Sequence, residues 1–574
     1  MSDQNRIALE TQIDKDGREF STTRTSTPGG VDEMFISPNQ AIPVVFVPGI
    51  MGSPLIATGD NRGKWDGQGK WAWFPDDAYS WVVKGYGKLE HDQRRHLLDP
   101  TKTRALDSAR DADMAQLESA CKGTSMPAEE AARRGWGSVM ISCYGKILLH
   151  LENQLRFIFY RGHPYPGTYG AMPSNPAAWG DLKGYDKLSD ETLRKAAAWR
   201  FPVYAVGYNW VDSNSKAADF LKERIDAIRA DCRNRLKLKC DKVILVTHSM
   251  GGLVARMCAK RNPDDILGIV HGEQPAIGAG TAYARVRGGW DYDWTSFISY
   301  VGAKALGKTA WEVSAVFSAG AGPLELLPNH LYGSGWLKIQ YGKGRSAETV
   351  VTLPKKDPYE EIYKDKAHWW RLIHPECLVE KKKITDAILK GKEWDKYIKQ
   401  LSKAQAFHAD LGAYYHPKTY AHCGADSGQP AWHEVAWQLD PMAMLDPLSD
   451  PDAKVRSMKP SPAGALEASF VVDYMDGRCE IHDKSAAGDV WINRNGVGVI
   501  AHSNGNHYRA YLSDKDDAGD ATVPAHSGLA PRDHATFFAK MKGFEHQGSY
   551  ENETVQAVTL YSMISLAATA EKLA

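Results

Sequence analysis

Residues 242–260 read KVILVTHSMGGLVARMCAK, and this stretch decides the fold. Residues 243–246 are continuously β-branched or aliphatic, which is typical of a parallel strand buried on both faces. The residues THSMG at 247–251 predict a sharp turn, and the apolar and basic residues after them predict a helix that ends before Asn262 and Pro263. A strand, a tight turn through a serine and a helix therefore follow one another without a linker.

Three other apolar segments extend this pattern, at residues 43–47, 202–206 and 266–271. Each is short, rich in β-branched residues and followed by a turn, so each predicts a buried strand. Apolar residues also recur at helical spacing after the second segment, at positions 218, 221, 225 and 228. This alternation of strands and helices predicts a mostly parallel sheet with helices on both of its faces.

The length of the chain predicts large insertions in this sheet. A core of this kind needs only about 250 residues, whereas the chain has 574. We expect a polar N-terminal segment at 1–39 and one domain at 40–574. Caps or lids are expected in insertions at about 53–200, 273–415 and 425–515, because loops of that length usually carry structure and function of their own.

The composition excludes some classes of protein. Lys plus Arg and Asp plus Glu are both 70, so the formal net charge is zero, which argues against binding to nucleic acid. No apolar run is long enough to predict a membrane-spanning helix. The first 30 residues contain no recognisable leader, so we expect synthesis in the cytoplasm and, if the protein is exported, a route without a cleaved leader.

Tryptophan is abundant, with 18 residues, and four of them cluster at positions 65, 71, 73 and 81. Tryptophan combines a large apolar surface with one polar N–H group and is favoured at binding grooves and lipid interfaces. The cluster therefore predicts either a groove or an interfacial anchor in the first insertion.

The THSMG turn has the residue types that a nucleophilic serine needs. In a strand–turn–helix elbow the serine backbone is strained, its hydroxyl projects above the sheet, and the residues two before and two after it must be small. Gly251 meets this requirement, whereas Thr247 stands where glycine is usual. The helix that follows adds the positive end of its dipole to the site.

Four segments together resemble the lipase branch of the α/β-hydrolases. They are IPVVFVPGIMGS at 42–53, VYAVGYNW at 203–210, VILVTHSMGGLVAR at 243–256 and GDATVP at 519–524. The nearest group is that of lecithin:cholesterol acyltransferase and the PGAP1-like lipases, and the bacterial type VI secretion lipase effectors are similar too. The resemblance implies the α/β-hydrolase fold and a catalytic triad in the chain order serine, acid, histidine.

Downstream of Ser249, the favoured acid is Asp520 in the small-residue turn GDATVP. The alternative acid is Asp426, which follows an expected strand at 419–423. The turn of Asp520 resembles the GDGTVP motif of the lipase family, with Ala521 in place of the second glycine, and it lies close in sequence to a suitable histidine. Asp520 is therefore the predicted acid.

The favoured base is His546, which lies just before a final helix expected from Glu553 to about Leu573. His526 and His534 are the alternative bases, but their positions relative to that helix suit the fold less well than the position of His546. The resemblance implies that His248, inside the turn, points away from the serine hydroxyl. His271 ends the fourth strand and is expected either to line the site or to be a core residue.

These residues predict acyl-ester cleavage through a covalent intermediate. His546 would take the proton of Ser249 as it attacks, and Asp520 would hold the imidazole in the right tautomer. The oxyanion would be bound by two backbone N–H groups, one from Met250 and one from the Gly49–Gly52 loop. The family pattern points to Met51 for the second donor, and Ile50 beside it is expected to line the site.

The insertions bear on the substrate. Residues 296–327 are apolar with few charges and predict a packed cap helix or an amphipathic lid that opens at lipid. Residues 380–403 hold eight lysines against four acids and predict a solvated helix face or a surface for anionic headgroups. We expect a phospholipase A-type hydrolase acting on membrane phospholipids; the alternatives are a triacylglycerol or carboxylesterase, or an acyltransferase, without a role in toxicity.

The family likeness also implies an antibacterial type VI secretion effector that works in the periplasm of a target cell. Such an effector has two protein partners, a component of the secretion apparatus and a cognate immunity protein. No cofactor is required by the expected chemistry. Asp514, Asp516 and Asp517 do not fit the EF-hand pattern, so no metal site is predicted, although a calcium ion there stays open as an alternative.

Overall fold

The structure is a computed structural model. It describes residues 6–8, 12–15, 19–21, 31–33, 38–61, 70–156, 158–160, 163–164, 176–290, 304–342, 347–441, 468–483, 490–494, 497–501 and 507–573. Within these ranges no helix has the length and apolar character needed to cross a bilayer.

A seven-stranded sheet forms the centre of the described chain. Its strands, in spatial order, are β12 (Asp181–Lys183), β28 (Phe537–Met541), β19 (Thr419–Gly424), β16 (Ile266–Gly272), β15 (Val243–His248), β6 (Val44–Val47) and β13 (Val203–Ala205). Neighbouring strands are parallel except at one edge, where β12 pairs antiparallel with β28. The predicted fold class, an α/β fold with a mostly parallel sheet, is confirmed.

Helices cover both faces of this sheet, as predicted. Alternate residues of a strand point to opposite faces, and both sets are buried here. Val45 and Leu245 pack with helices α8 (Asn214–Asn234) and α9 (Gly251–Arg261). Their neighbours Phe46 and Val246 pack on the other face with α5 (Ile141–Gln154), α7 (Asp190–Ala196) and α17 (Glu553–Ala567).

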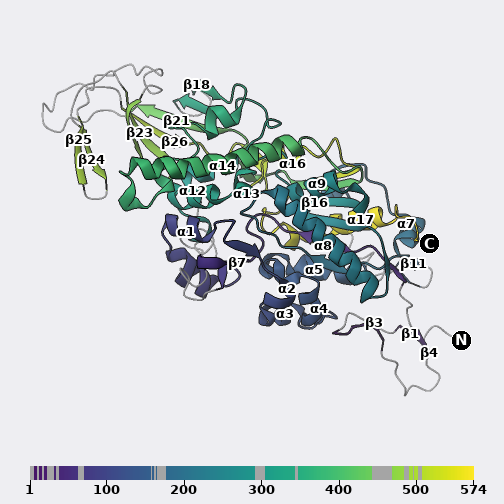
Figure 1. The fold of residues 1–574 in the computed structure, drawn as a ribbon. Helices are drawn as coiled ribbons and strands as arrows, with labels where there is room; N and C mark the ends of the chain where they lie inside the picture. The colour runs from purple at the N-terminus through teal and green to yellow at the C-terminus, as the bar shows by residue number, and fades with distance from the viewer. Residues whose placement is uncertain are drawn as a thin grey trace.

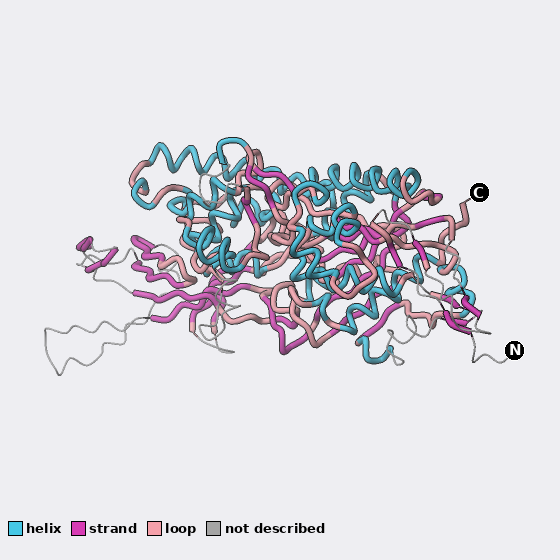
Figure 2. The backbone as a smooth tube through the Cα atoms, turned by 90° about the horizontal axis from the view of Figure 1, so that it is seen from below, coloured by secondary structure: helices cyan, strands magenta, loops and turns pink. Residues whose placement is uncertain are grey.

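A second, six-stranded sheet is assembled from the second and third expected insertions. Its order is β18 (Glu348–Leu353), β17 (Leu337–Tyr341), β21 (Val435–Pro441), β26 (His507–Leu512), β23 (Arg478–Asp483) and β22 (Ala468–Asp473). Helices α10 (Gly280–Gly288), α12 (Ala310–Ala319) and α14 (Ala387–Leu411) share an apolar core with it. Figures 1 and 2 show this sheet at the end of the molecule away from both termini, with its helices gathered on one side.

The apolar segment predicted as a cap helix or lid, at residues 296–327, is described from residue 304 onward. Helix α12 and the short α13 (Ala321–Leu324) follow there, and most of their residues are buried. This part is a cap helix packed on the second core. Residues 296–303 of the predicted lid lie outside the described residues.

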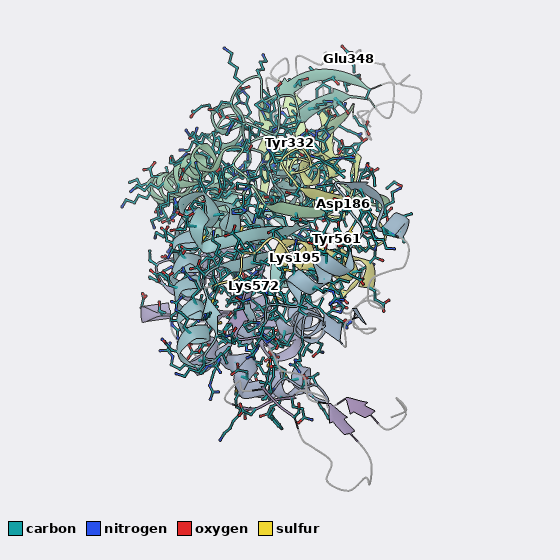
Figure 3. All side chains as sticks on the ribbon, turned by 90° about the vertical axis from the view of Figure 1, so that its right-hand side faces the viewer. Asp186, Lys195, Tyr332, Glu348, Tyr561 and Lys572 are labelled. Carbon is teal, nitrogen blue, oxygen red and sulfur yellow. The ribbon has the colours of Figure 1, made fainter. Side chains whose placement is uncertain are left out.

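The first expected insertion holds a small sheet of β7 (Leu55–Ala57), β8 (Trp71–Trp73) and β9 (Thr103–Ala105). Besides α5 and α7, this insertion contains the helices α1 (His91–Leu97), α2 (Ser108–Asp111), α3 (Met114–Cys121) and α4 (Ala128–Arg133). It also supplies β12 at the edge of the central sheet. The hydroxyl of Tyr561 on α17 donates to the Asp186 carbonyl and accepts from its N–H, which ties the end of the insertion to the last helix (Figure 3).

The tryptophan cluster is not a surface anchor where the structure describes it. Trp71 and Trp73 are buried, and Trp71 stacks on Phe74 with ring centroids 3.9 Å apart. The interfacial prediction is therefore wrong for these two, because strand β8 turns both into the core. Trp65 lies outside the described residues, as does the side chain of Trp81.

The remaining described strands are short. Strands pair as β1 (Arg6–Ala8) with β4 (Val31–Glu33), β2 (Gln12–Ile13) with β3 (Glu19–Phe20), β5 (Gln40–Ala41) with β14 (Lys239–Cys240), β10 (Phe159–Tyr160) with β11 (His163–Pro164), β20 (Asp426–Ala431) with β27 (Asp517–Gly519), and β24 (Val490–Arg494) with β25 (Val497–Ala501). A one-turn helix, α16 (Ala525–Gly528), follows β27.

Candidate active site

The turn between β15 and α9 has the geometry of a nucleophile elbow. Ser249 has φ = 53°, a left-handed backbone conformation that costs energy for a residue with a side chain. A Cβ at Gly251 would lie 2.4 Å from the Val47 carbonyl oxygen, so only glycine fits there. The strained turn lifts the serine hydroxyl out of the sheet at the carboxyl ends of the parallel strands.

Thr247, which stands in place of the usual glycine, is accommodated by its neighbours. Its side chain is fully buried, and its hydroxyl lies 3.0 Å from Nδ1 of His271. Its carbonyl oxygen accepts a hydrogen bond of 3.0 Å from the Tyr550 hydroxyl. The extra atoms of threonine therefore pack and hydrogen-bond inside the core.

Ser249, His546 and Asp520 form a continuous hydrogen-bonded chain. The distance from Ser249 Oγ to His546 Nε2 is 2.8 Å, and that from His546 Nδ1 to Asp520 Oδ2 is also 2.8 Å. The three residues are 5%, 9% and 1% exposed, respectively. The structure thus brings together the serine, the histidine and the acid that were favoured from the sequence, at the distances that proton transfer requires.

The turn after β27 holds Asp520 in place. Its Oδ1 accepts the N–H groups of Thr522 (3.1 Å) and Val523 (2.7 Å), which leaves Oδ2 for the imidazole. Ala521 adopts φ = 71° to close this turn. The N–H of His546 also donates to the Asp520 carbonyl oxygen at 2.8 Å, so backbone and side chain both couple the two loops.

The charged groups around His546 raise the pKa of its imidazole. Burial alone would lower the pKa of His546, but the charge and hydrogen bond of Asp520 raise it above its usual value, with a smaller contribution from Glu273. An imidazole with a raised pKa is a stronger acceptor for the serine proton and stabilises the imidazolium that forms.

The competing acid and histidines are bound to other partners, although Asp426 pairs with Gly519 next to Asp520. The Asp426 carboxylate accepts the N–H groups of Gly428 and Gly543 at 2.8 and 3.0 Å. His526 Nε2 lies 2.9 Å from the Tyr332 carbonyl oxygen, and the His534 ring stacks on Tyr415. None of these three has a described hydrogen bond to Ser249 or His546.

The loop after β6 lies against the serine and offers oxyanion donors. A Cβ at Gly49 would lie 2.9 Å from the Cβ of Ser249. The N–H groups of Gly49 and Gly52 donate to the Tyr144 hydroxyl and the Gly49 carbonyl oxygen, respectively. Of the four residues in the loop, this leaves the N–H groups of Ile50 and Met51 as candidates, beside that of Met250 at the start of α9.

Met51 is held in an unusual conformation. Its φ is 62°, and its carbonyl oxygen accepts a 2.7 Å hydrogen bond from Trp73 Nε1. Ile50 is half-buried against the same core. Trp73 and Tyr144 both come from the first insertion and both reach the site, which the sequence did not reveal because no local pattern marks a contact across so many residues.

His271 is a core residue. Burial lowers its pKa well below the usual value, and Nδ1 lies against the Thr247 hydroxyl. His248 also turns away from the serine hydroxyl. Its ring nitrogens lie 3.0 Å from the Tyr144 hydroxyl and 3.0 Å from the His546 carbonyl oxygen.

Two of the three aspartates at 514–517 bind backbone amides. The Asp516 carboxylate accepts the N–H groups of His433 and Glu434, and Asp517 accepts that of His526. In the described part of the chain no group of three or more His, Cys, Asp or Glu residues is arranged to hold a metal ion.

The order of the central sheet and the elbow at Ser249 define an α/β-hydrolase fold. Among solved structures, the chain resembles one in the crystal structure of the Tle4–Tli4 complex. The two share 27% sequence identity over 93% of this chain and 99% of that one, with a TM-score of 0.67. The predicted likeness to the type VI lipase effectors is confirmed at the level of this structural match.

A structure of phospholipase PlaB from Legionella pneumophila, in complex with thio-NAD, also matches, at 12% identity over 64% of this chain and 87% of that chain. Its TM-score is 0.17, which is too low to support an argument. No protein-family profile matches the sequence, and no curated protein matches it either.

Proposed function

We propose that the protein is a serine-dependent lipid ester hydrolase of the phospholipase A type that acts on membrane phospholipids. The observation that supports this most directly is the hydrogen-bonded chain from Ser249 through His546 to Asp520, set in a strained elbow. The structural likeness to Tle4 supports the same class of protein.

The reaction follows from this geometry. As Ser249 Oγ attacks the ester carbonyl, its proton passes to Nε2 of His546, and Asp520 stabilises the imidazolium. The N–H groups of Met250 and Met51 bind the oxyanion. The imidazolium protonates the leaving alcohol, and water, deprotonated by His546, then releases the fatty acid. None of these steps calls for a cofactor.

Helix α14 supports an anionic membrane surface as the place of action. Lysines recur at i, i+4, i+7 and i+11 on its solvent side, at positions 392, 396, 399 and 403, and all four are exposed. Trp394, Tyr397 and Leu401 on the other side are buried in the second core. Ile388, which is 74% exposed, lies at the same solvent-facing stripe. Lysines around an exposed apolar residue suit the headgroups of anionic lipids.

The direct test is incubation of the protein with mixed phospholipid vesicles, followed by mass analysis of the products. Free fatty acid together with lysophospholipid supports the proposal. Ser249→Ala should lower the rate by at least ~10³-fold, and hydrolysis retained by the purified variant would contradict the role of Ser249. Release of fatty acid from triacylglycerol alone, or transfer of acyl chains to an alcohol, would favour a general esterase or an acyltransferase.

We also propose that the protein is an antibacterial effector with a cognate immunity protein. The support is that Tle4 is seen in a complex with Tli4. Expression with an added signal peptide should be toxic, expression without one should not, and Ser249→Ala should remove the toxicity. Harmlessness in both compartments would contradict this role while leaving the ester chemistry intact.

A further inference from the structure

A second buried hydrogen-bonded chain runs behind the serine and joins two loops of the site. His248 Nε2 lies 3.0 Å from the carbonyl oxygen of His546, and His248 Nδ1 lies 3.0 Å from the hydroxyl of Tyr144. The N–H of Gly49 donates to the same hydroxyl oxygen at 3.3 Å. The chain therefore begins at the backbone of the histidine loop and ends at the backbone of the loop after β6.

With a neutral imidazole, one arrangement of protons satisfies all three contacts. A carbonyl oxygen can only accept, so His248 must carry its proton on Nε2. Nδ1 then accepts from the Tyr144 hydroxyl, whose oxygen remains free to accept from Gly49. Burial, together with the charge of His546, lowers the pKa of His248 to about 3, so this neutral ring keeps its tautomer throughout the pH range of catalysis.

The loop at the end of this chain fits closely around the serine and the tyrosine. A Cβ at Gly49 would lie 2.9 Å from Ser249 Cβ, and one at Gly52 would lie 2.8 Å from the Tyr144 hydroxyl. Tyr144 itself is buried and packs on Phe46 of β6, with ring centroids 5.0 Å apart. A shift of Tyr144 would therefore move the loop that carries the Ile50 and Met51 N–H groups.

We propose that Tyr144 and His248 are positioning residues that fix the oxyanion loop relative to the loop of the catalytic histidine. Neither forms a hydrogen bond with the reacting atoms. Both act through the backbone of Gly49 and His546, and the His248 ring also packs on the His546 ring, with centroids 4.9 Å apart. The inference rests on the proposed hydrolase function and deepens it, because it makes the first insertion, which supplies Tyr144, part of the catalytic apparatus.

The decisive variant is Tyr144→Phe, which keeps the ring and removes only the hydroxyl. Gly49 and His248 then each lose a buried partner. With a soluble short-chain ester, we expect kcat to fall at least about tenfold while KM changes less than about twofold, since oxyanion contacts form in the transition state. His248→Asn, whose shorter amide cannot span both partners, should have a similar effect.

A double-variant cycle separates positioning from general damage. If both residues act through one chain, Tyr144→Phe with His248→Asn should lower kcat no further than the larger single effect. Two independent effects would multiply, and that result would overturn the proposal.

Tyr283→Phe is the matched control. The Tyr283 hydroxyl is also buried, donates to the Trp370 carbonyl oxygen at 2.6 Å and accepts from Trp437 Nε1 at 2.9 Å, but it lies in the second core. It should lower the melting temperature about as much as Tyr144→Phe and leave kcat unchanged. An equal loss of kcat in this control would also overturn the proposal.

Hydrogen exchange tests the chain without any turnover. The Gly49 amide should exchange slowly in the wild type and faster in Tyr144→Phe, whereas amides of α17 should be unaffected. Absence of ester hydrolysis by the wild type would contradict the proposed function alone. An unchanged Gly49 exchange rate would contradict the positioning chain alone.

Discussion

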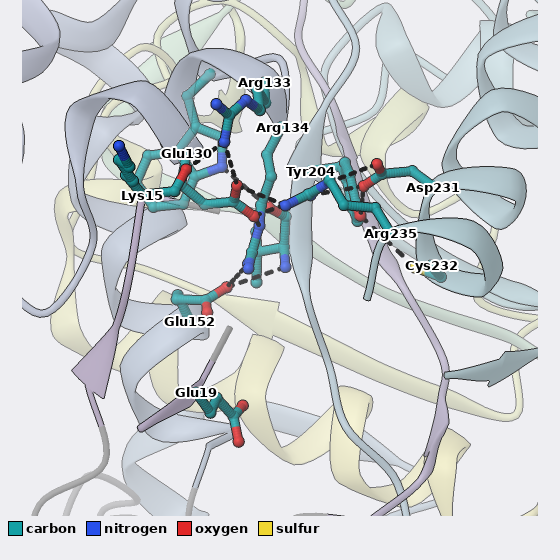
Figure 4. A network of polar contacts seen from close by, with 12 residues as sticks. Lys15, Glu19, Glu130, Arg133, Arg134, Glu152, Tyr204, Asp231, Cys232 and Arg235 are labelled. Carbon is teal, nitrogen blue, oxygen red and sulfur yellow. Dashed lines mark hydrogen bonds and ion pairs between the residues drawn. The ribbon is translucent and has the colours of Figure 1, made fainter. Parts of the chain in front are cut away.

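Two of the buried polar networks in the described part of the chain are built on different principles. One is the chain of Ser249, His546 and Asp520, and the other is a cluster of charges between the first insertion and the end of α8 (Figure 4). In the cluster, Arg134 lies 2.7 Å from Glu130 and 2.9 Å from Glu152, and Arg235 lies 2.8 Å from Glu130. Each charge there faces an opposite charge.

The two networks differ in whether their protons can move. Burial lowers the pKa of Arg134, but the charges of Glu152 and Glu130 raise it above the usual value. Arg134 therefore stays charged at every accessible pH. Burial likewise works against Glu152, yet Arg134 and Arg156 keep its pKa low. Glu130 on α4 and Glu152 on α5 are thereby held together by fixed charges. The site instead uses a serine and an imidazole, whose protons can be exchanged near neutral pH.

The largest difference should appear when a carboxylate of the site loses its charge. Asp520→Asn preserves the size of the side chain, but its amide favours the wrong tautomer of His546, and comparable changes lower kcat by about 10⁴-fold. We expect such a loss with an almost unchanged melting temperature. Steady-state kinetics measure it, and activity within tenfold of the wild type would show that another acid, such as Asp426, takes the role.

Removal of a charge from the cluster should lower the stability of the fold and leave kcat unchanged. Arg134→Met leaves Glu152 and Glu130 buried with fewer partners, and breaking a buried ion pair in this way destabilises proteins by about 3–5 kcal/mol. Denaturant unfolding should show this loss while kcat per folded molecule is unchanged.

The exposed ion pair of Lys146 and Glu551, at 2.9 Å, is the control for this comparison. Lys146→Met should change stability by less than about 1 kcal/mol. If Arg134→Met were equally mild, the cluster would not be what holds α4 and α5 in place.

The pH dependence of kcat/KM should also distinguish the two networks. His546 must be neutral to accept the serine proton, so kcat/KM should fall about tenfold per pH unit on the acid side. Because its pKa is raised, the midpoint should lie above the usual value of about 6.5, and Asp520→Asn should move it down. A midpoint at or below about 6.5 in the wild type would contradict the role of Asp520.

The raised pKa of His546 also makes the stability of the fold depend on pH. Stability falls as the pH rises, whereas activity increases. The folded-state pKa of His546 lies above its unfolded value, so the protonated ring paired with Asp520 stabilises the fold fully at pH values below about 6.5. This contribution is lost as the pH rises through the raised pKa. The Arg134 cluster should contribute equally on both sides of that range.

Local sequence predicted five strands of the central sheet because their signals are local, whereas β12 and β28 were not predicted. The strands expected at 43–47, 202–206, 243–246 and 266–271 fall within two residues of β6, β13, β15 and β16. The residues brought into contact at the site also stood out, since Ser249 and Asp520 lie in short motifs and His546 lies just before the final helix.

The second sheet could not be predicted in this way. Strand β17 pairs with β21, almost a hundred residues later, and the two belong to different insertions. The roles of Tyr144 and Trp73 were also missed, because their contacts with the site depend on how the first insertion folds back. Long-range pairing leaves no periodic signature in a single sequence.

Within the site itself, the smallest effect should come from Thr247, where the core and the elbow meet. Thr247→Val keeps the shape of the side chain but removes the hydroxyl that lies 3.0 Å from His271 Nδ1. Within the described residues His271 Nε2 has no hydrogen-bond partner, so the ring would be buried with neither nitrogen bonded. We expect a loss of about 1 kcal/mol in unfolding free energy and a kcat within twofold of the wild type. A large loss of kcat would mean that Thr247 shapes the elbow itself, and the division between a catalytic and a structural network would then fail at this residue.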